Sequence, residues 1–176
     1  MKNTFITVVM AAAVLIAGCG KKSSSSSAPP PPAQAEAASL PSSVLQPALA
    51  AWQHGDSAAA VSSFIAADWS ARPLFAAGSA LNLSEDQFRA LSSADRQAKS
   101  SEMTAQLDSF KQLAATVTQA GRDAASKGDA AQARKYFTSL KQCGKALDGP
   151  DCSSLVQLVG QSLQKRADTE LLKIGQ

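Results

Sequence analysis

Histidine, aromatic side chains and charge are all scarce in this sequence. Its 176 residues contain one histidine, His54, and only 5% aromatic and 18% charged residues. A single imidazole excludes a histidine-rich metal site and leaves most hydrolytic triads one candidate base. Strand-forming β-branched and aromatic residues are sparse, whereas about one residue in five is alanine, the best helix former. The composition therefore predicts an all-α fold.

Net charge is also low, which bears on the class of partner. The whole chain carries a formal charge of +3, and from Leu40 onward 14 basic residues face 13 acidic ones, a net charge of +1. A surface that binds nucleic acid carries a far larger basic excess. We therefore expect no nucleic-acid partner.

The first 18 residues have the pattern of an export signal. A single charge at Lys2 precedes an apolar run of 13 residues from Phe5 to Ala17, and the small residue Gly18 follows. A helix needs about 20 apolar residues to span a bilayer, so this run is too short for a typical spanning segment. We interpret residues 1–18 as a signal peptide.

The end of that segment resembles the lipobox of bacterial lipoprotein signal peptides. The resemblance covers the N-terminus alone and rests on Leu15, Ile16, Ala17, Gly18 and Cys19. It implies cleavage between Gly18 and Cys19, a diacylglyceryl group on the thiol of Cys19 and acylation of the new amino terminus. Several acyl chains anchor a protein stably where one binds only marginally. Membrane lipid is thus a predicted partner, and this covalent lipid is the only cofactor expected.

The resemblance also implies a place in the cell. Lipoproteins of enteric bacteria with aspartate after the lipidated cysteine stay in the inner membrane, and Gly20 stands there in this chain. This favours the outer membrane of a bacterial cell envelope, with the protein facing the periplasm. An uncleaved anchor and a soluble secreted form are the alternatives.

A linker separates the lipidation site from the rest of the chain. Residues 19–39 are rich in serine, proline and alanine and lack large apolar side chains, so they cannot offset the entropy of ordering. Residues 40–176 have the length and the apolar content of one domain. The predicted organisation is a signal peptide, a flexible tether and a single helical domain.

Several helix starts are recognisable in the domain. Ser43 with Gln46 and Ser84 with Gln87 have the spacing of a capping box, and Asp56 follows a glycine at a position suited to capping a helix. The segment between residues 69 and 83 contains a proline and a glycine and is expected to be irregular.

Apolar residues at steps of three and four predict long amphipathic helices after residue 84. The glycines of these stripes predict close helix crossings at Gly121 and Gly144. The whole domain is expected to form six or seven helices in antiparallel hairpins, with a two-stranded coiled coil as the alternative. The longest stripe comprises Met103, Leu107, Phe110, Ala114, Val117, Gly121 and Ala124, and a last helix is expected from Cys152 to Ile174.

Two segments resemble the tetratricopeptide motif, in which small and aromatic residues interlock across a helical hairpin. In one, the matching residues are Gly121, Gly128, Asp129, Ala133 and Phe137; in the other, they are Gly55, Asp56, Ala60, Phe64 and Ala67. The turns are 73 residues apart without a third unit between them, so an alanine-rich hairpin without a true repeat is the alternative. The resemblance implies a groove lined by Ala115, Thr118, Arg122 and Ala125.

Two cysteines, Cys143 and Cys152, remain in the predicted domain. An even count in an exported protein favours a disulfide, which would close the turn between the last two helices. A redox-active pair lacks the expected CxxC spacing, and a zinc site lacks further ligands.

These features favour a non-enzymatic, lipid-anchored envelope protein that acts as an adaptor or structural component through an unknown envelope protein partner. The alternative is a helical module that binds a peptide or small ligand near Arg122, Trp52 or Trp69. No catalytic residue or metal ligand is predicted. An enzyme would have to use His54 as its general base, and no acid or serine stands at a spacing suited to assist it.

Overall fold

The computed structural model describes residues 43–175. The predictions for the signal peptide, for cleavage and lipidation at Gly18 and Cys19, and for the tether lie outside the described residues. Six α-helices and one short 3-10 helix are present, and the described chain contains no strand, which confirms the all-α prediction. They are α1 (Gln46–Gln53), α2 (Ser57–Ile65), η1 (Ala80–Asn82), α3 (Glu85–Ala90), α4 (Ser93–Ser126), α5 (Ala130–Leu147) and α6 (Ser154–Ile174).

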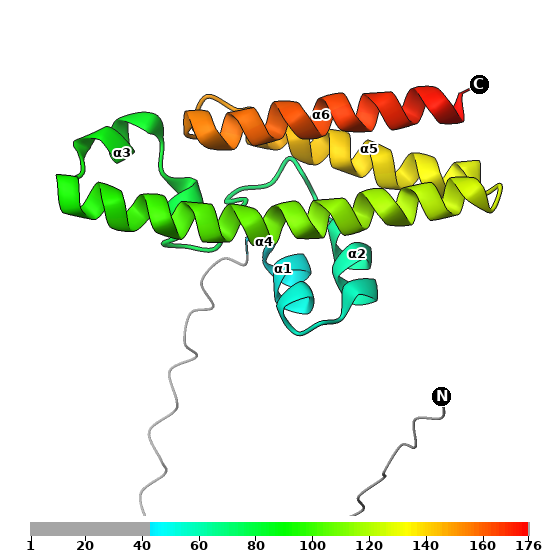
Figure 1. Ribbon diagram of the computed structural model, residues 1–176, viewed down its shortest axis with the longest axis horizontal. Helices are drawn as coiled ribbons and strands as arrows, with labels where there is room; N and C mark the ends of the chain where they lie inside the picture. The colour runs from blue at the N-terminus through cyan, green and yellow to red at the C-terminus, as the bar shows by residue number, and fades with distance from the viewer. Residues whose placement is uncertain (1–42, 176) are drawn as a thin grey trace, which may run out of the picture. The chain divides into compact units, whose positions relative to one another are not determined.

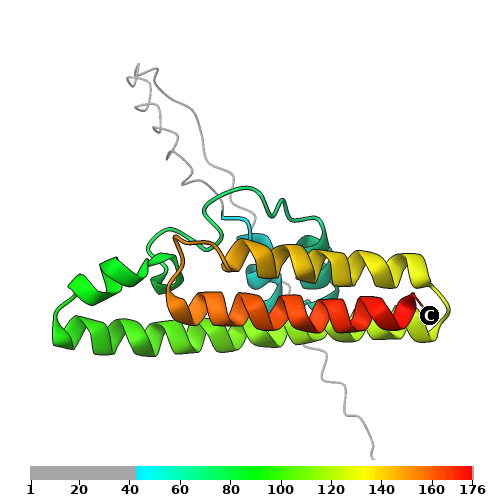
Figure 2. The ribbon, with the colours of Figure 1, turned by 90° about the horizontal axis from the view of Figure 1, so that it is seen from above.

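The long helix α4 is the element around which the others pack (Figures 1 and 2). It contacts α5 on one side and the α1–α2 hairpin on the other, while α3 doubles back beside its N-terminal half. Helix α6 runs antiparallel to α5 and packs chiefly against it. None of the helices between residues 43 and 175 combines the length and the apolar character needed to cross a bilayer.

Two helical hairpins have the same turn, as the glycine and aspartate pairs predicted. Gly55 and Gly128 both adopt a positive φ of 79°, which a residue without a Cβ adopts at no steric cost. The next residue caps the following helix: Asp56 accepts from the backbone N–H of Ala59, and Asp129 from that of Gln132, each at 2.9 Å. The hairpins α1–α2 and α4–α5 therefore share their local geometry, although α4 has 34 residues and α1 only 8.

The capping predictions had different outcomes. The capping box of Ser84 and Gln87 is confirmed, because both of its hydrogen bonds are present, at 3.2 and 2.9 Å. The box predicted at Ser43 is wrong: α1 begins at Gln46 after Leu45, and no side chain caps it. The backbone before α1 instead pairs with the irregular loop, since Leu45 N–H donates to the Leu74 carbonyl at 3.0 Å.

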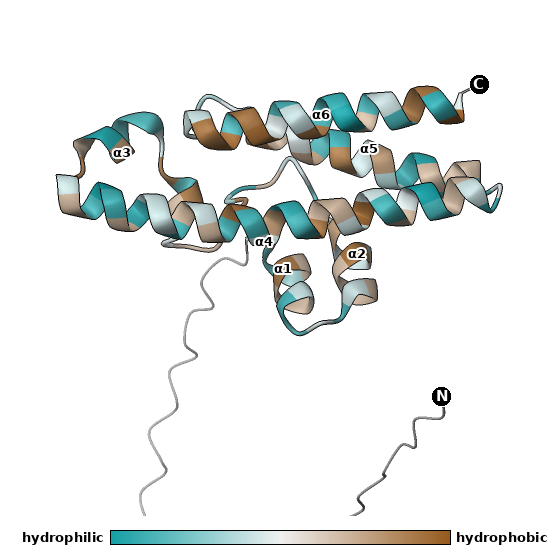
Figure 3. Cartoon of the chain, in the orientation of Figure 1, coloured by the Kyte–Doolittle hydropathy of each residue, from teal (hydrophilic) through white to brown (hydrophobic). Residues whose placement is uncertain are grey.

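The apolar stripe predicted on α4, from Met103 to Ala124, forms the central part of the hydrophobic core. Six of its seven residues are buried and Ala124 is half-buried. Fully buried Phe64, Phe110 and Phe137 from three different helices pack in this part of the core. Figure 3 shows the consequence on α4, where brown apolar residues alternate with teal polar ones along the helix.

A buried hydrogen-bond chain joins the N-terminal half of the domain to α5. The indole N–H of Trp69 donates to the hydroxyl of Ser139 at 3.0 Å, and that hydroxyl donates to the carbonyl of Phe64 at 3.2 Å. Each of these three buried polar groups therefore has a hydrogen-bond partner. These hydrogen bonds fix the loop after α2 against α5, although the two segments are 70 residues apart in the sequence.

Glycines mark two close contacts between helices. An ideal Cβ on Gly121 of α4 would lie 2.7 Å from the ring of Phe137 on α5, and one on Gly144 would lie 2.7 Å from the carbonyl oxygen of Gly160 on α6. Such distances are far below ordinary van der Waals contact, so the two pairs of helices approach as closely as they do only because these side chains are absent. Both predicted crossings are confirmed.

Candidate functional site

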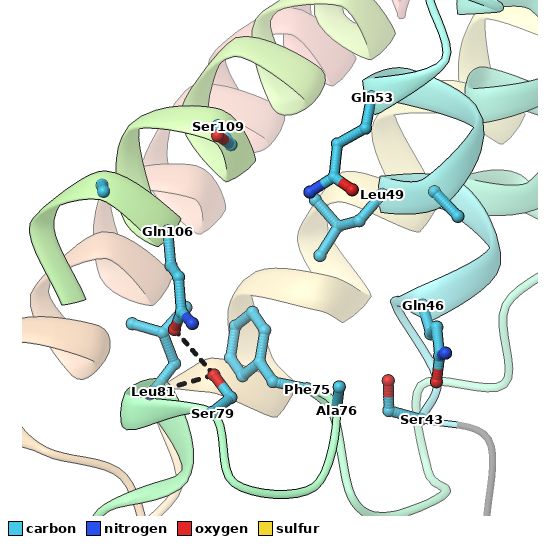
Figure 4. A pocket seen from close by; sticks show the side chains of 12 residues that line it. Ser43, Gln46, Leu49, Gln53, Phe75, Ala76, Ser79, Leu81, Gln106 and Ser109 are labelled. Atoms are coloured by element: carbon cyan, nitrogen blue, oxygen red, sulfur yellow. Dashed lines mark hydrogen bonds between the residues drawn. The ribbon is translucent and has the colours of Figure 1, made fainter. Parts of the chain in front are cut away.

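A groove of about 440 Å³ lies between α1, α4 and the loop that leads to η1 (Figure 4). Leu49, Phe75 and Leu81 provide its apolar surface, whereas amides and hydroxyls provide the polar surface. No charged side chain lines it. The volume falls within the range of about 300–1,000 Å³ of small-molecule sites.

The α4 side of the groove is held by a hydrogen-bond network. Ser79 Oγ donates to Gln106 Oε1 at 2.7 Å, and Gln106 Nε2 donates to Glu102 at 3.1 Å. Glu102 also accepts from Lys99 Nζ at 2.6 Å and from the backbone N–H of Ala80 at 3.3 Å. The hydrogen bond from Lys99 lowers the pKa of the Glu102 carboxyl, which lies behind the groove and is paired with that lysine.

The α1 side carries polar groups that are not engaged. The side-chain amides of Gln46 and Gln53 are exposed, line the groove and make no hydrogen bond to another described residue. Their positions differ by seven, so they lie on the same side of α1, about 10.5 Å apart along its axis. Three residues of an extended peptide span about 10 Å. The two amides thus match the spacing of backbone groups in an extended chain.

A third polar group at the groove is Ser43. Its hydroxyl is buried, the residue being 2% exposed, and has no hydrogen-bond partner among the described residues. A buried hydroxyl without a partner costs about 1–3 kcal/mol. Together with Gln46 and Gln53, Ser43 gives this wall unused hydrogen-bonding capacity.

Arg122, predicted as a contact for a partner, is engaged within the domain instead. Its Nε donates to Glu170 Oε1 of α6 at 3.1 Å, and its Nη2 donates to the same oxygen. Lys173 Nζ also contacts this carboxylate, at 3.2 and 3.3 Å. The three side chains line a cavity of about 340 Å³ between α4, α5 and α6. Arg122 is half-exposed, but its carboxylate partner belongs to the same chain.

The groove implied by the tetratricopeptide resemblance is not formed as expected. Thr118 is buried and donates to the Ala114 carbonyl at 2.8 Å, while Ala115 and Ala125 are exposed on α4. Thr118 lies in the core of the domain, where the α1–α2 hairpin and α5 pack against α4.

The Glu170 carboxylate predicts a specific pH dependence of stability. The hydrogen bonds from Arg122 lower its pKa against the opposing effect of burial, and Lys173 lowers it further. Because the pKa is lowered on folding, its contribution is fully present above the unfolded value of about 4.3 and is lost as the pH falls through the folded value. We expect Glu170→Gln to destabilise the domain by about 1–2 kcal/mol at pH 7.

Urea unfolding of Glu170→Gln and of the unsubstituted chain at pH 7 and pH 3 measures this effect. The difference in unfolding free energy should shrink at the lower pH, because pH 3 lies below the unfolded pKa and the ionic contribution decreases there. An equal difference at both pH values would contradict an ionic contribution of Glu170.

Of the two tryptophans that were predicted as partner contacts, Trp69 belongs to the core and Trp52 packs against it. Trp69 is 8% exposed and its ring packs against Phe64, with centroids 4.7 Å apart. Trp52 is half-buried against the same cluster. The prediction that Trp69 forms part of a contact surface is therefore corrected, since both its ring and its N–H are used inside the domain.

The predicted disulfide is not formed, because Cys143 and Cys152 are both free thiols. Cys143 lies on the core face of α5, where burial raises its pKa well above the ordinary value. Cys152 precedes α6, which begins only at Ser154, and lines a different cavity beside Arg72. The helix predicted to include Cys152 is thus shorter at its start.

His54 stands at the C-terminal end of α1, where its backbone N–H donates to the Ala50 carbonyl at 3.1 Å. Its imidazole makes no hydrogen bond to the described part of the chain. Between residues 43 and 175, no group of three or more His, Cys, Asp or Glu side chains is placed to hold a metal ion.

Sequence reasoning missed the groove itself. Gln46 was interpreted as part of a capping box, and Gln53 was not singled out. The sequence shows that the two glutamines are two helical turns apart. This spacing does not predict a groove, because the other walls are formed by the loop with Phe75 and by helix α4. A search for exposed amides at steps of seven on one helix would have found them.

Fold and site together define an all-α domain of helical hairpins with an uncharged surface groove. In the comparisons with known proteins, no protein-family model matches the chain, and neither does any curated protein or solved structure.

Proposed function

We propose that this protein is a lipid-anchored component of the bacterial cell envelope whose helical domain binds an extended segment of another envelope protein. The anchoring rests on the lipobox-like residues that end at Cys19. The linker of residues 19–39 lets the domain reach partners away from the lipid surface.

The observation that carries the binding function is the pair of free amides on α1. An amide side chain donates and accepts at once, so Gln46 and Gln53 can each pair with a peptide unit. The apolar surface around Leu49 and Phe75 takes the alternate side chains of such a segment. Because no charged residue lines the groove, the preferred segment is uncharged.

Crosslinking tests this function in intact cells. A photoreactive amino acid at position 109, on the α4 side of the groove, is compared with one at position 112, an exposed glutamine on α4 outside it. We expect a protein adduct from position 109 and none from position 112. Adding Gln46→Ala should reduce the adduct about five-fold, as expected for loss of a hydrogen bond of about 1 kcal/mol.

Two results would count against the proposal. Equal adducts from both positions, or an adduct insensitive to Gln46→Ala, would exclude the groove as the binding site. The anchor is tested separately with radioactive palmitate, since Cys19→Ser should abolish labelling. Labelling that persists in Cys19→Ser would refute lipidation at this residue.

A further inference from the structure

The outer face of α6 combines exposed leucines with cations. Leu155, Leu158 and Leu172 are 44%, 63% and 69% exposed, and they are the large hydrophobic side chains left exposed in the described chain. Figure 3 shows brown segments near both ends of α6 and teal segments between them. A soluble surface rarely places its exposed leucines on one helix without a partner for them.

The charged groups on this face have one sign. Lys165, Arg166 and Lys173 are exposed, and the side chain of the acid Asp168 is 49% exposed but is paired with a cation. Of the two acids of α6, Glu170 is buried against Arg122 and Lys173, and Asp168 is paired with Lys141 of α5 at 2.6 Å. Leu158, Lys165 and Leu172 recur at steps of seven, which places them on one side of the helix. We call Leu155, Leu158, Lys165, Arg166, Leu172 and Lys173 the α6 outer face.

The near-zero charge of the domain conceals a separation of charge. Helices α5 and α6 contain seven basic and two acidic residues, a net charge of +5. The other described residues contain seven basic and eleven acidic ones, a net charge of −4. Asp151 of the intervening turn and Glu85 beside Ser154 lie at the N-terminal end of α6, whereas Asp148 accepts hydrogen bonds from Gln161 and Gln164 in the middle of the helix. The cations of the α6 outer face lie in its second half.

We propose that the α6 outer face docks the domain onto an anionic phospholipid surface. Exposed leucines beside lysine and arginine on a helix are the features of helices that lie in the membrane interface. Each cation near an anionic leaflet adds about a five-fold gain in binding. A second copy of the chain is disfavoured, because an antiparallel pairing of two α6 helices would bring Lys165 and Arg166 of both copies together.

This inference rests on the proposed lipid anchor for its local concentration. A short tether holds a domain at an effective concentration of about 1 mM near the membrane to which it is anchored. Even a weak affinity of the α6 outer face for lipid is then enough to keep the domain docked. The 23 residues between Cys19 and Ser43 reach at most about 75 Å. Helix α4 is about 51 Å long, which is shorter than this reach. The tether therefore allows α6 to face the membrane, although α1 and α6 lie on opposite sides of α4 (Figure 1).

The test uses two matched cysteine probes. Thr169 on α6 and Thr104 on α4 are both exposed, and each donates to the carbonyl four residues before it. The full lipidated chain carrying Thr169→Cys or Thr104→Cys is placed in vesicles of phosphatidylcholine alone or mixed with phosphatidylglycerol. The rate of labelling by a membrane-impermeant maleimide is then measured, with the unsubstituted chain as the background for Cys143 and Cys152.

On vesicles with phosphatidylglycerol, we expect labelling at position 169 to slow about ten-fold, while position 104 is unaffected. High salt and the double change Lys165→Gln, Arg166→Gln should each restore the rate. The change Arg96→Gln, Lys127→Gln removes the same charge from exposed sites elsewhere and should leave protection intact. Leu158→Gln should reduce the protection without unfolding the domain, because this side chain is exposed.

Three results would overturn the proposal: equal rates at positions 169 and 104, equal protection on both kinds of vesicle, or protection found in native envelopes but not on lipid alone. The last result would assign the α6 outer face to a protein. If palmitate labelling shows no lipid on Cys19, the same vesicles are titrated with the unlipidated chain, so a failed anchor and a failed docking surface give different outcomes.

Discussion

Replacing Gly160 by alanine is expected to destabilise the domain by about 3 kcal/mol, although alanine is the better helix former. An ideal Cβ at Gly160 would lie 2.6 Å from the Gly144 carbonyl oxygen and 3.0 Å from Asp148 N and Leu147 Cβ. Two of these three atoms are backbone, so the clash is relieved only if α5 and α6 separate. Separation exposes the buried contacts of the whole helix pair, which outweighs the gain of about 1 kcal/mol in helix propensity.

Thermal and urea unfolding followed by circular dichroism measure this effect. Gly144→Ala should behave in the same way, because its Cβ would lie 2.7 Å from the Gly160 oxygen. Gly175→Ala is the control: its nearest neighbours would be 3.6 and 3.7 Å away, and its stability should change by less than about 0.5 kcal/mol. A Gly160→Ala variant as stable as the unsubstituted chain would show that the helices do not cross this closely.

Truncating Phe137 to alanine is expected to cost about 3–5 kcal/mol and to reverse the effect of a second substitution at Gly121. Phe137 is 1% exposed, and an ideal Cβ on Gly121 would lie 2.7 Å from its ring. In the unsubstituted chain, Gly121→Ala should therefore destabilise by about 1–3 kcal/mol. In the Phe137→Ala background the ring is gone, and the same change should stabilise α4 by up to about 1 kcal/mol.

A double-mutant cycle over the two positions checks this reversal of sign. If Phe137→Ala is too unstable to measure, Phe137→Leu is the second background, in which Gly121→Ala should cost less than in the unsubstituted chain. Additive effects in both backgrounds would contradict direct packing of Gly121 against the Phe137 ring.

The elements that could be predicted are those set by near neighbours in the sequence. Asp56, Asp129 and the Ser84–Gln87 pair cap helices through hydrogen bonds that span three residues, so the pattern alone sufficed. The capping box at Ser43 failed because tertiary contacts compete there: the backbone after Ser43 pairs with the loop at Leu74. A local pattern cannot show that a distant segment offers a better partner.

The contact predictions did not anticipate pairing inside the domain. Trp69 and Arg122 were predicted as contacts for a ligand, Arg122 because its guanidinium group can hold a carboxylate or a peptide end. Trp69 bonds to Ser139 and Arg122 to Glu170, which are 70 and 48 residues away. Glu85 likewise lies in the first turn of α3 but also bonds to Ser154 at the start of α6. Polar side chains that seem free in a sequence are often paired across the fold.

Sequence alone determined that the domain is helical, where its hairpin turns lie and which stripe of α4 is buried, because periodicity and caps act over one or two helical turns. It also predicts a lipid anchor at Cys19, which lies outside the described residues. Tertiary structure decided that the thiols are unpaired, that Arg122 pairs with Glu170, and that an uncharged groove and a basic, leucine-bearing face of α6 are left exposed. Those outcomes depend on which helix faces meet, and that is set by packing over the whole chain.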